Sequence, residues 1–89
     1  MSTKTLPAGT VHDTVPDDLA AALMGDDRAM ATWVDITVLA RNEWICLVTD
    51  AKQARTRLRR LERTLSQLGE GQRRPCCWPG CPHRERTGA

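Results

Sequence analysis

The residues best suited to chemistry in this 89-residue chain are clustered near its C-terminus. Three of the four cysteines and one of the two histidines fall in one short run: Cys76, Cys77, Cys81 and His83. Three thiolates and one imidazole form a ligand set that tetrahedral zinc favours. The sequence therefore predicts a zinc site in this cluster.

The spacing of these candidate ligands is shorter than in common zinc motifs, where a spacer of about a dozen residues or more separates two ligand pairs. Four ligands from so short a run would strain the tetrahedral geometry, and Cys46, His12 or a second chain are alternative donors. Two other states stay open: a disulfide that joins Cys76 or Cys77 to Cys81, and reduced thiols without a ligand. A reducing compartment favours metal binding or redox-responsive thiols over a stable bridge.

The bulk composition indicates one small domain. The chain is 40% hydrophobic and 27% charged, and a core of this size is marginal without a staple or a partner. No run approaches the roughly 20 apolar residues that span a bilayer, and the first residues lack the apolar stretch of a secretory signal. We therefore expect a cytoplasmic protein without a membrane span. No catalytic triad, phosphate loop or zinc-hydrolase motif is recognisable, so we expect a non-enzymatic protein.

Opposite charges are concentrated in the two halves of the chain. Residues 1–35 carry six aspartates against one lysine and one arginine, whereas residues 52–74 carry eight basic residues against two glutamates. Such asymmetry predicts an anionic partner, or docking between the two charged halves.

Hydrophobic periodicity predicts an all-α fold, a small bundle of three to four helices. Residues 1–15 lack an apolar period and are expected to form a flexible, disordered arm. A first helix should begin near Pro16 and stop at Gly25. Asp26 or Asp27 should cap a second helix. The expected buried stripe of that helix is Ala29, Met30, Trp33 and Val34.

The most apolar stretch, residues 37–51, is expected to form a central and largely buried helix. Its β-branched residues make a strand a competing interpretation over residues 45–48, although the length and the polar interruption by Arg41 and its two successors favour a helix. We interpret Cys46 in this stretch as a core residue rather than a ligand.

The sharpest amphipathic pattern lies in residues 52–68. Its apolar positions recur at spacings of four and three, which predicts a single buried seam: Ala54, Leu58, Leu61, Leu65 and Leu68. Opposite this seam, 3.6 residues per turn places a stripe of basic side chains: Lys52, Arg55, Arg59 and Arg63. Gly69 and Gly71 should end the helix.

The basic stripe is expected to continue into an irregular Cys/His-rich basic tail over residues 72–89. The further candidate binding residues there are Arg73, Arg74, Trp78, Arg84 and Arg86. Arginines neutralise phosphates, and a tryptophan can stack on an unpaired base. The leading hypothesis is therefore a module that binds RNA, DNA or a ribonucleoprotein. The alternatives are an acidic protein partner, a thiol- or metal-responsive stress role, and an ordinary solvated helix face.

Residues 16–71 resemble the helical domain of the YdeI/OmpD-associated family, also described as bacteriocin-protection proteins. The resemblance rests on DLAAAL (residues 18–23) and on ARNEWICLVTDAKQARTRLRRLERTLSQL (residues 40–68). In the second stretch an alanine–lysine pair precedes a threonine- and arginine-rich helix, as in the family, but Arg55 stands where the family usually has an acid. The resemblance implies a compact helical module and no specific activity. The cysteine tail lies outside the family pattern.

Overall fold

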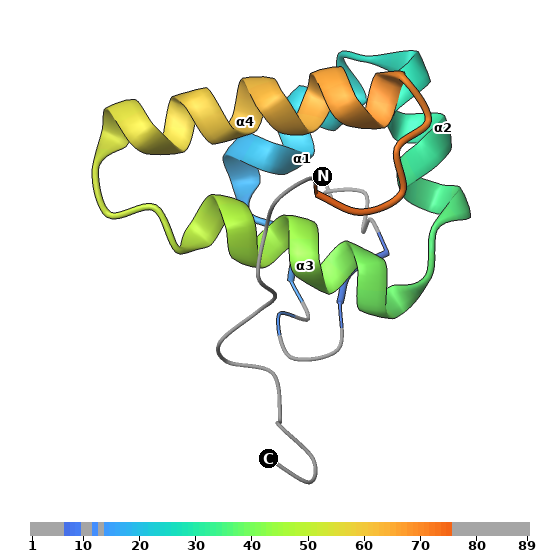
Figure 1. The fold of residues 1–89 in the computed structure, drawn as a ribbon, viewed down its shortest axis with the longest axis horizontal. Coiled ribbons are helices and arrows are strands. Elements are labelled where there is room, and N and C mark those ends of the chain that lie inside the picture. Colours follow the sequence, from blue (N-terminus) through green and yellow to red (C-terminus); the bar gives the residue numbers. More distant parts are fainter. Residues whose placement is uncertain (1–6, 10–11, 13, 76–89) are drawn as a thin grey trace, which may run out of the picture.

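The computed structural model describes residues 7–9, 12 and 14–75, and these contain four helices and no strand (Figure 1). The helices are α1 (Asp17–Met24), α2 (Asp27–Asp35), α3 (Val38–Thr49) and α4 (Ala54–Gly69). The predicted all-α fold is therefore confirmed, and a helix replaces the competing strand over residues 45–48. Over the described ranges, no helix is both long enough and apolar enough to cross a membrane.

Side-chain caps explain where α2 and α3 begin. The Asp26 carboxylate accepts the backbone N–H of Ala29 at 3.0 Å, and the Thr37 hydroxyl accepts that of Ala40 at 3.0 Å. These bonds satisfy backbone donors that the first turn of a helix leaves without helical partners. Pro16 precedes α1, where its missing N–H removes no helical hydrogen bond.

The hydrophobic core lies between α4 and the other three helices. Figure 1 shows α3 and α4 along two sides of the bundle, and α4 packs against α1, α2 and α3. Trp33 of α2 and Trp44 of α3 are the largest fully buried side chains. Further hydrophobic residues with no exposed surface surround them: Leu19, Leu23, Ala29, Cys46, Val48 and Leu68. Cys46 is therefore a core residue, as predicted.

The inner face of α4 differs from the predicted seam at its N-terminal end. Leu58 is 58% exposed and Ala54 is exposed too, so both depart from the predicted seam, whereas Leu65 packs against the core as predicted. The innermost positions are Arg57, Leu61, Thr64 and Leu68. The spacing of four, three and four is retained, but its first inward position is an arginine. The prediction that Leu58 is buried was wrong, because Arg57 turns inward to meet an acid on α1.

The stripe on α2 also differs at one position. Val34 is 54% exposed, whereas Ala29, Trp33 and Ile36 are buried. The helix ends at Asp35, and Ile36 is the extended residue that follows it. Ile36 reaches the core from this position, and Val34 is left on the outer side. The prediction that Val34 belongs to the buried stripe was wrong.

Of the predicted arm, the structure describes residues 7–9, 12, 14 and 15, and we call residues 7–9 and 12 the front segment. The carbonyls of Pro7 and Ala8 accept hydrogen bonds from side chains of α2 and α3, and the backbone N–H of His12 donates to α3. At these positions the chain contacts the bundle. Buried side-chain donors hold them, and hydrophobic periodicity does not register such contacts.

Candidate partner-binding surface

The predicted basic stripe is divided by the structure. Arg55 and Arg59 are exposed on the N-terminal half of α4, and Lys52 is exposed two residues before this helix begins, whereas Arg63 is half-buried. Leu58 is exposed as well. We call the four exposed residues, Lys52, Arg55, Leu58 and Arg59, the basic face.

Two other arginines of α4 bind within the bundle and hold the helix in place. Arg57 Nε and Nη2 donate to the two carboxylate oxygens of Asp18 on α1, at 2.6 and 3.0 Å. This bidentate contact lowers the pKa of Asp18 and raises that of Arg57. Arg60 Nη1 donates to the carbonyl of Leu47 on α3 at 2.9 Å. Because α4 is fastened to both neighbours, the basic face has a fixed orientation.

Leu58 adds an apolar side chain to the basic face. Residues three apart are neighbours on a helix surface, so Leu58 lies beside Arg55, whereas Arg59, the next residue in the chain, points about 100° further around the helix. A single exposed leucine is common on protein surfaces. Apolar side chains together with arginines, however, are characteristic of the centre of protein interfaces, where lysine and acidic residues are depleted. The residue types of the basic face therefore suit contact with another protein.

The basic face does not continue to the end of α4. Glu62 and Glu70 are exposed along the C-terminal half of the helix. At 1.5 Å per residue, the stretch from Arg59 to Gly69 spans about 15 Å. The basic face and Arg73 are therefore separated, and the structure does not join them into one positive surface.

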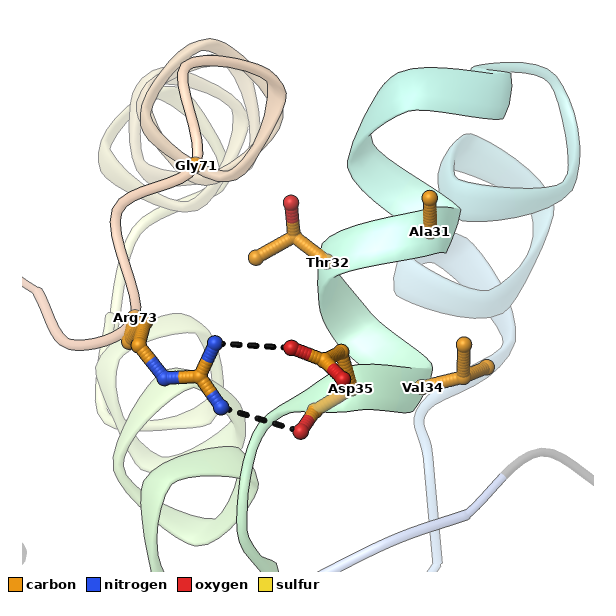
Figure 2. A pocket seen from close by; sticks show the side chains of 6 residues that line it. All are labelled: Ala31, Thr32, Val34, Asp35, Gly71 and Arg73. Atoms are coloured by element: carbon orange, nitrogen blue, oxygen red, sulfur yellow. Dashed lines mark hydrogen bonds and ion pairs between the residues drawn. The ribbon is translucent and has the colours of Figure 1, made fainter.

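Arg73 is fixed against the end of α2 (Figure 2). Its Nη1 donates to a carboxylate oxygen of Asp35 at 2.8 Å, and its Nη2 donates to the Asp35 carbonyl at 3.0 Å. The indole of Trp44 donates to the Arg73 carbonyl at 3.1 Å, and Pro75 is buried while Arg74 is exposed. A shallow, open pocket of about 500 Å³ adjoins this contact. Its lining residues are Ala31, Thr32, Val34, Asp35, Gly71 and Arg73.

This pocket offers little for an anion, since the Arg73 guanidinium is already bound by Asp35 on two sides. The Asp35 carboxylate is exposed, so water screens its ion pair with Arg73 and the pair adds little to stability. The pocket therefore marks where the chain leaves the bundle rather than a second binding centre.

The remaining predicted site residues lie outside the described residues: Cys76, Cys77, Trp78, Cys81, His83, Arg84 and Arg86. Over residues 7–9, 12 and 14–75, no group of three or more histidine, cysteine or acidic residues is placed to hold a metal ion. Of the alternative ligands, Cys46 is fully buried. The zinc site stays a prediction.

Sequence reasoning missed Leu58 as a surface residue and Arg57 as an internal one. The sequence held a signal for the exposure of Leu58, because this leucine stands between two arginines in the chain and the start of α4 is otherwise rich in charge. Which of these arginines turns inward depends on Asp18, which is far away in sequence, so helical spacing alone could not decide it.

The fold and its surface define a class: a small all-α module with an exposed helix face that is both basic and apolar. Residues 14–71 match the family model described as Bacteriocin-protection, YdeI or OmpD-Associated, and the chain belongs to this family. The match includes all four helices and the basic face, and it ends before Arg73. Comparison with curated proteins and with solved structures gave no match.

Proposed function

We propose that this member of the bacteriocin-protection family is a non-enzymatic binding module whose basic face docks on an acidic surface of a partner protein. The observation that carries the proposal is the 58% exposure of Leu58 beside the exposed Arg55. Burial of Leu58 would supply apolar area, and the arginines would pair with acids at the edge of the contact.

Nucleic acid is the second candidate, and the geometry supports it less well. Phosphate binding rests on the number of cations that reach the backbone. Only Lys52, Arg55 and Arg59 of the predicted basic stripe are exposed, and the exposed acids Glu62 on α4 and Glu70 directly after it follow them. An exposed leucine adds nothing to phosphate binding. The protein partner is therefore favoured.

Three variants of the full chain test the basic face: Leu58→Ser, the double variant Arg55→Glu with Arg59→Glu, and the control Arg28→Glu. Arg28 is exposed on α2, outside the basic face. Arg28→Glu therefore changes the net charge by as much as each single reversal on the basic face does. Partners captured from nuclease-treated extract would be identified, purified and titrated by calorimetry against each variant. We expect Leu58→Ser to weaken binding roughly tenfold, charge reversal to weaken it further, and Arg28→Glu to have little effect.

A parallel capture from extract without nuclease separates the two candidates. Capture that disappears with nuclease, depends on the arginines and ignores Leu58→Ser would indicate nucleic acid instead. Equal affinities for all variants would refute any role of the basic face.

We also propose that Cys76, Cys77, Cys81 and His83 bind one zinc ion and that the protein works in the reducing cytoplasm. The donor set supports this proposal, because three thiolates and an imidazole match structural zinc sites and thiols stay reduced there. Native mass spectrometry should find one zinc per chain, lost in Cys77→Ser or Cys81→Ser. A metal-free mass with reduced thiols would exclude the zinc site, and a mass lower by two hydrogens would indicate a disulfide.

A further inference from the structure

The front segment is held on the bundle through its main chain. The indole Nε1 of Trp33 donates to the carbonyl of Pro7 at 2.9 Å, and Nε of Arg41 donates to the carbonyl of Ala8 at 3.1 Å. Both donors belong to helices, and both acceptors are backbone atoms. These bonds therefore engage the main chain of the front segment, and the Ala8 side chain packs against the hydrophobic core beside them.

The next residues of the front segment meet α3 at Asn42. The Asn42 side-chain oxygen accepts the backbone N–H of His12 at 2.8 Å. A Cβ added at Gly9 would clash with the Cα of Asn42, which is helix backbone and cannot move aside. Glycine is the only residue that permits so close an approach of two backbones. The site therefore selects for glycine directly after the two bound carbonyls.

Arg41 of this contact is also bound to the end of α2. Arg41 is only 8% exposed, and its Nη1 donates to the carbonyls of Trp33 and Ile36 at 3.3 and 2.7 Å. These bonds fix the guanidinium at the end of α2, so Nε already points to where an acceptor is needed. A buried charged donor without an acceptor is costly. Some backbone carbonyl must therefore occupy the position that Ala8 fills.

We propose that Trp33, Arg41 and Asn42 form a peptide-recognition site, and that the front segment occupies it in place of an external ligand. The ligand class is a peptide whose two consecutive backbone carbonyls accept from Trp33 and Arg41 and are followed directly by a glycine. The site lies on α2 and α3, apart from the basic face on α4, so it represents a second binding surface. Occupation by the chain's own segment keeps this surface closed until the segment is displaced.

The test uses the full chain with Gly9→Val, whose side chain cannot fit against Asn42 and so expels the front segment. A fluorescein-labelled peptide with the sequence of residues 5–14 would be titrated by fluorescence anisotropy. We expect it to bind the variant at least about tenfold more tightly than the wild type, whose site is filled at high effective concentration. The same peptide carrying Gly9→Val should not bind.

The control variant is Gly25→Ala, where the added Cβ meets nothing closer than 3.7 Å; it should behave as the wild type does. A folded Gly9→Val chain that fails to bind the peptide, or that binds both peptides equally, would overturn the proposal.

Hydrogen exchange of the wild type decides the question if Gly9→Val leaves too little folded protein. In the wild type, the indole N–H of Trp33 should exchange faster than the backbone N–H of the fully buried Val48, because the front segment opens without unfolding of the bundle. Equal exchange rates would mean that the front segment leaves only on global unfolding, and the site would then not be available to a ligand.

Discussion

The ion pair between Asp18 and Arg57 provides the sharpest test of how α4 is held. Its side chains are 39% and 31% exposed, so water screens the pair and its contribution is modest. The bidentate geometry, with bonds of 2.6 and 3.0 Å, places it at the upper end of that range, at about 1 kcal/mol. We expect Asp18→Asn to lower the free energy of unfolding by this amount, which corresponds to about 4–8 °C in Tm for a domain of this size.

Asp17→Asn is the matched control for this prediction. Asp17 also lies in the first turn of α1, so both carboxylates feel the same helix dipole, but Asp17 is exposed and pairs with no described residue. Thermal and urea denaturation, followed by circular dichroism, would compare the two variants. Equal losses of stability would refute the reasoning, because they would assign the whole effect to charge near the helix terminus.

The pH dependence of the same pair has a defined sign. The hydrogen bonds from Arg57 hold the pKa of Asp18 below its ordinary value of 3.8. A carboxyl group with a lowered pKa in the folded state stabilises the fold above its unfolded-state pKa, and this contribution fades as the pH falls below that value. The stability difference between wild type and Asp18→Asn should therefore be complete at pH 7 and shrink below about pH 4.

Two further pairs of variants test the packing of α4 and its end. Leu58→Ser should lower the free energy of unfolding by less than about 1 kcal/mol and Leu68→Ala by about 2–5 kcal/mol, measured by urea denaturation, since only Leu68 is buried. Similar losses in the two variants would contradict the orientation of the helix. Gly69→Ala should be neutral or stabilising by up to about 1 kcal/mol, because nothing lies within 4 Å of the added Cβ, whereas Gly71→Ala should destabilise by about 1 kcal/mol because φ is +88°. A Gly71→Ala chain as stable as Gly69→Ala would show that the left-handed turn is not required.

Local chemistry made the helices predictable from the sequence. Asp26 caps α2 at one of the two positions expected, Gly25 follows the last residue of α1, and Gly71 takes the left-handed conformation after α4. Each of these signals acts within a few residues, through a capping hydrogen bond or a backbone conformation that glycine allows. They depend little on the remainder of the fold, so a single sequence suffices to find them.

The orientation of the helices was less predictable. Leu58 and Val34 fit an apolar period, but the side that faces the core also depends on contacts with distant segments. Arg57 turns inward because Asp18 lies across from it. For the candidate surface, this means that the sequence located the arginines of α4 correctly on a helix, yet could not separate those that face a partner from those that hold the bundle together.

The polar run in α3 shows why the front segment was also missed. Arg41, Asn42 and Glu43 interrupt an apolar helix, yet all three are buried. Buried polar groups need hydrogen-bond partners, and an α-helix already uses most of its own carbonyls. The partners for Arg41 come from irregular backbone, namely Ala8 and the residues at the end of α2. A polar run inside an apolar helix is thus a signal for a covering segment.

The two buried tryptophans also find their hydrogen-bond partners in irregular backbone, one before α1 and one after α4. The indole N–H of Trp33 binds the carbonyl of Pro7, and that of Trp44 binds the carbonyl of Arg73. A buried indole needs an acceptor, and in both cases the acceptor lies in chain outside the helices. The residues that fill the core therefore also fix where the flanking segments run. Because Trp44 holds Arg73 near the end of α2, the chain leaves for the cysteine cluster at a point remote from the basic face. The two proposed activities, partner docking and zinc binding, are therefore attached to different ends of α4.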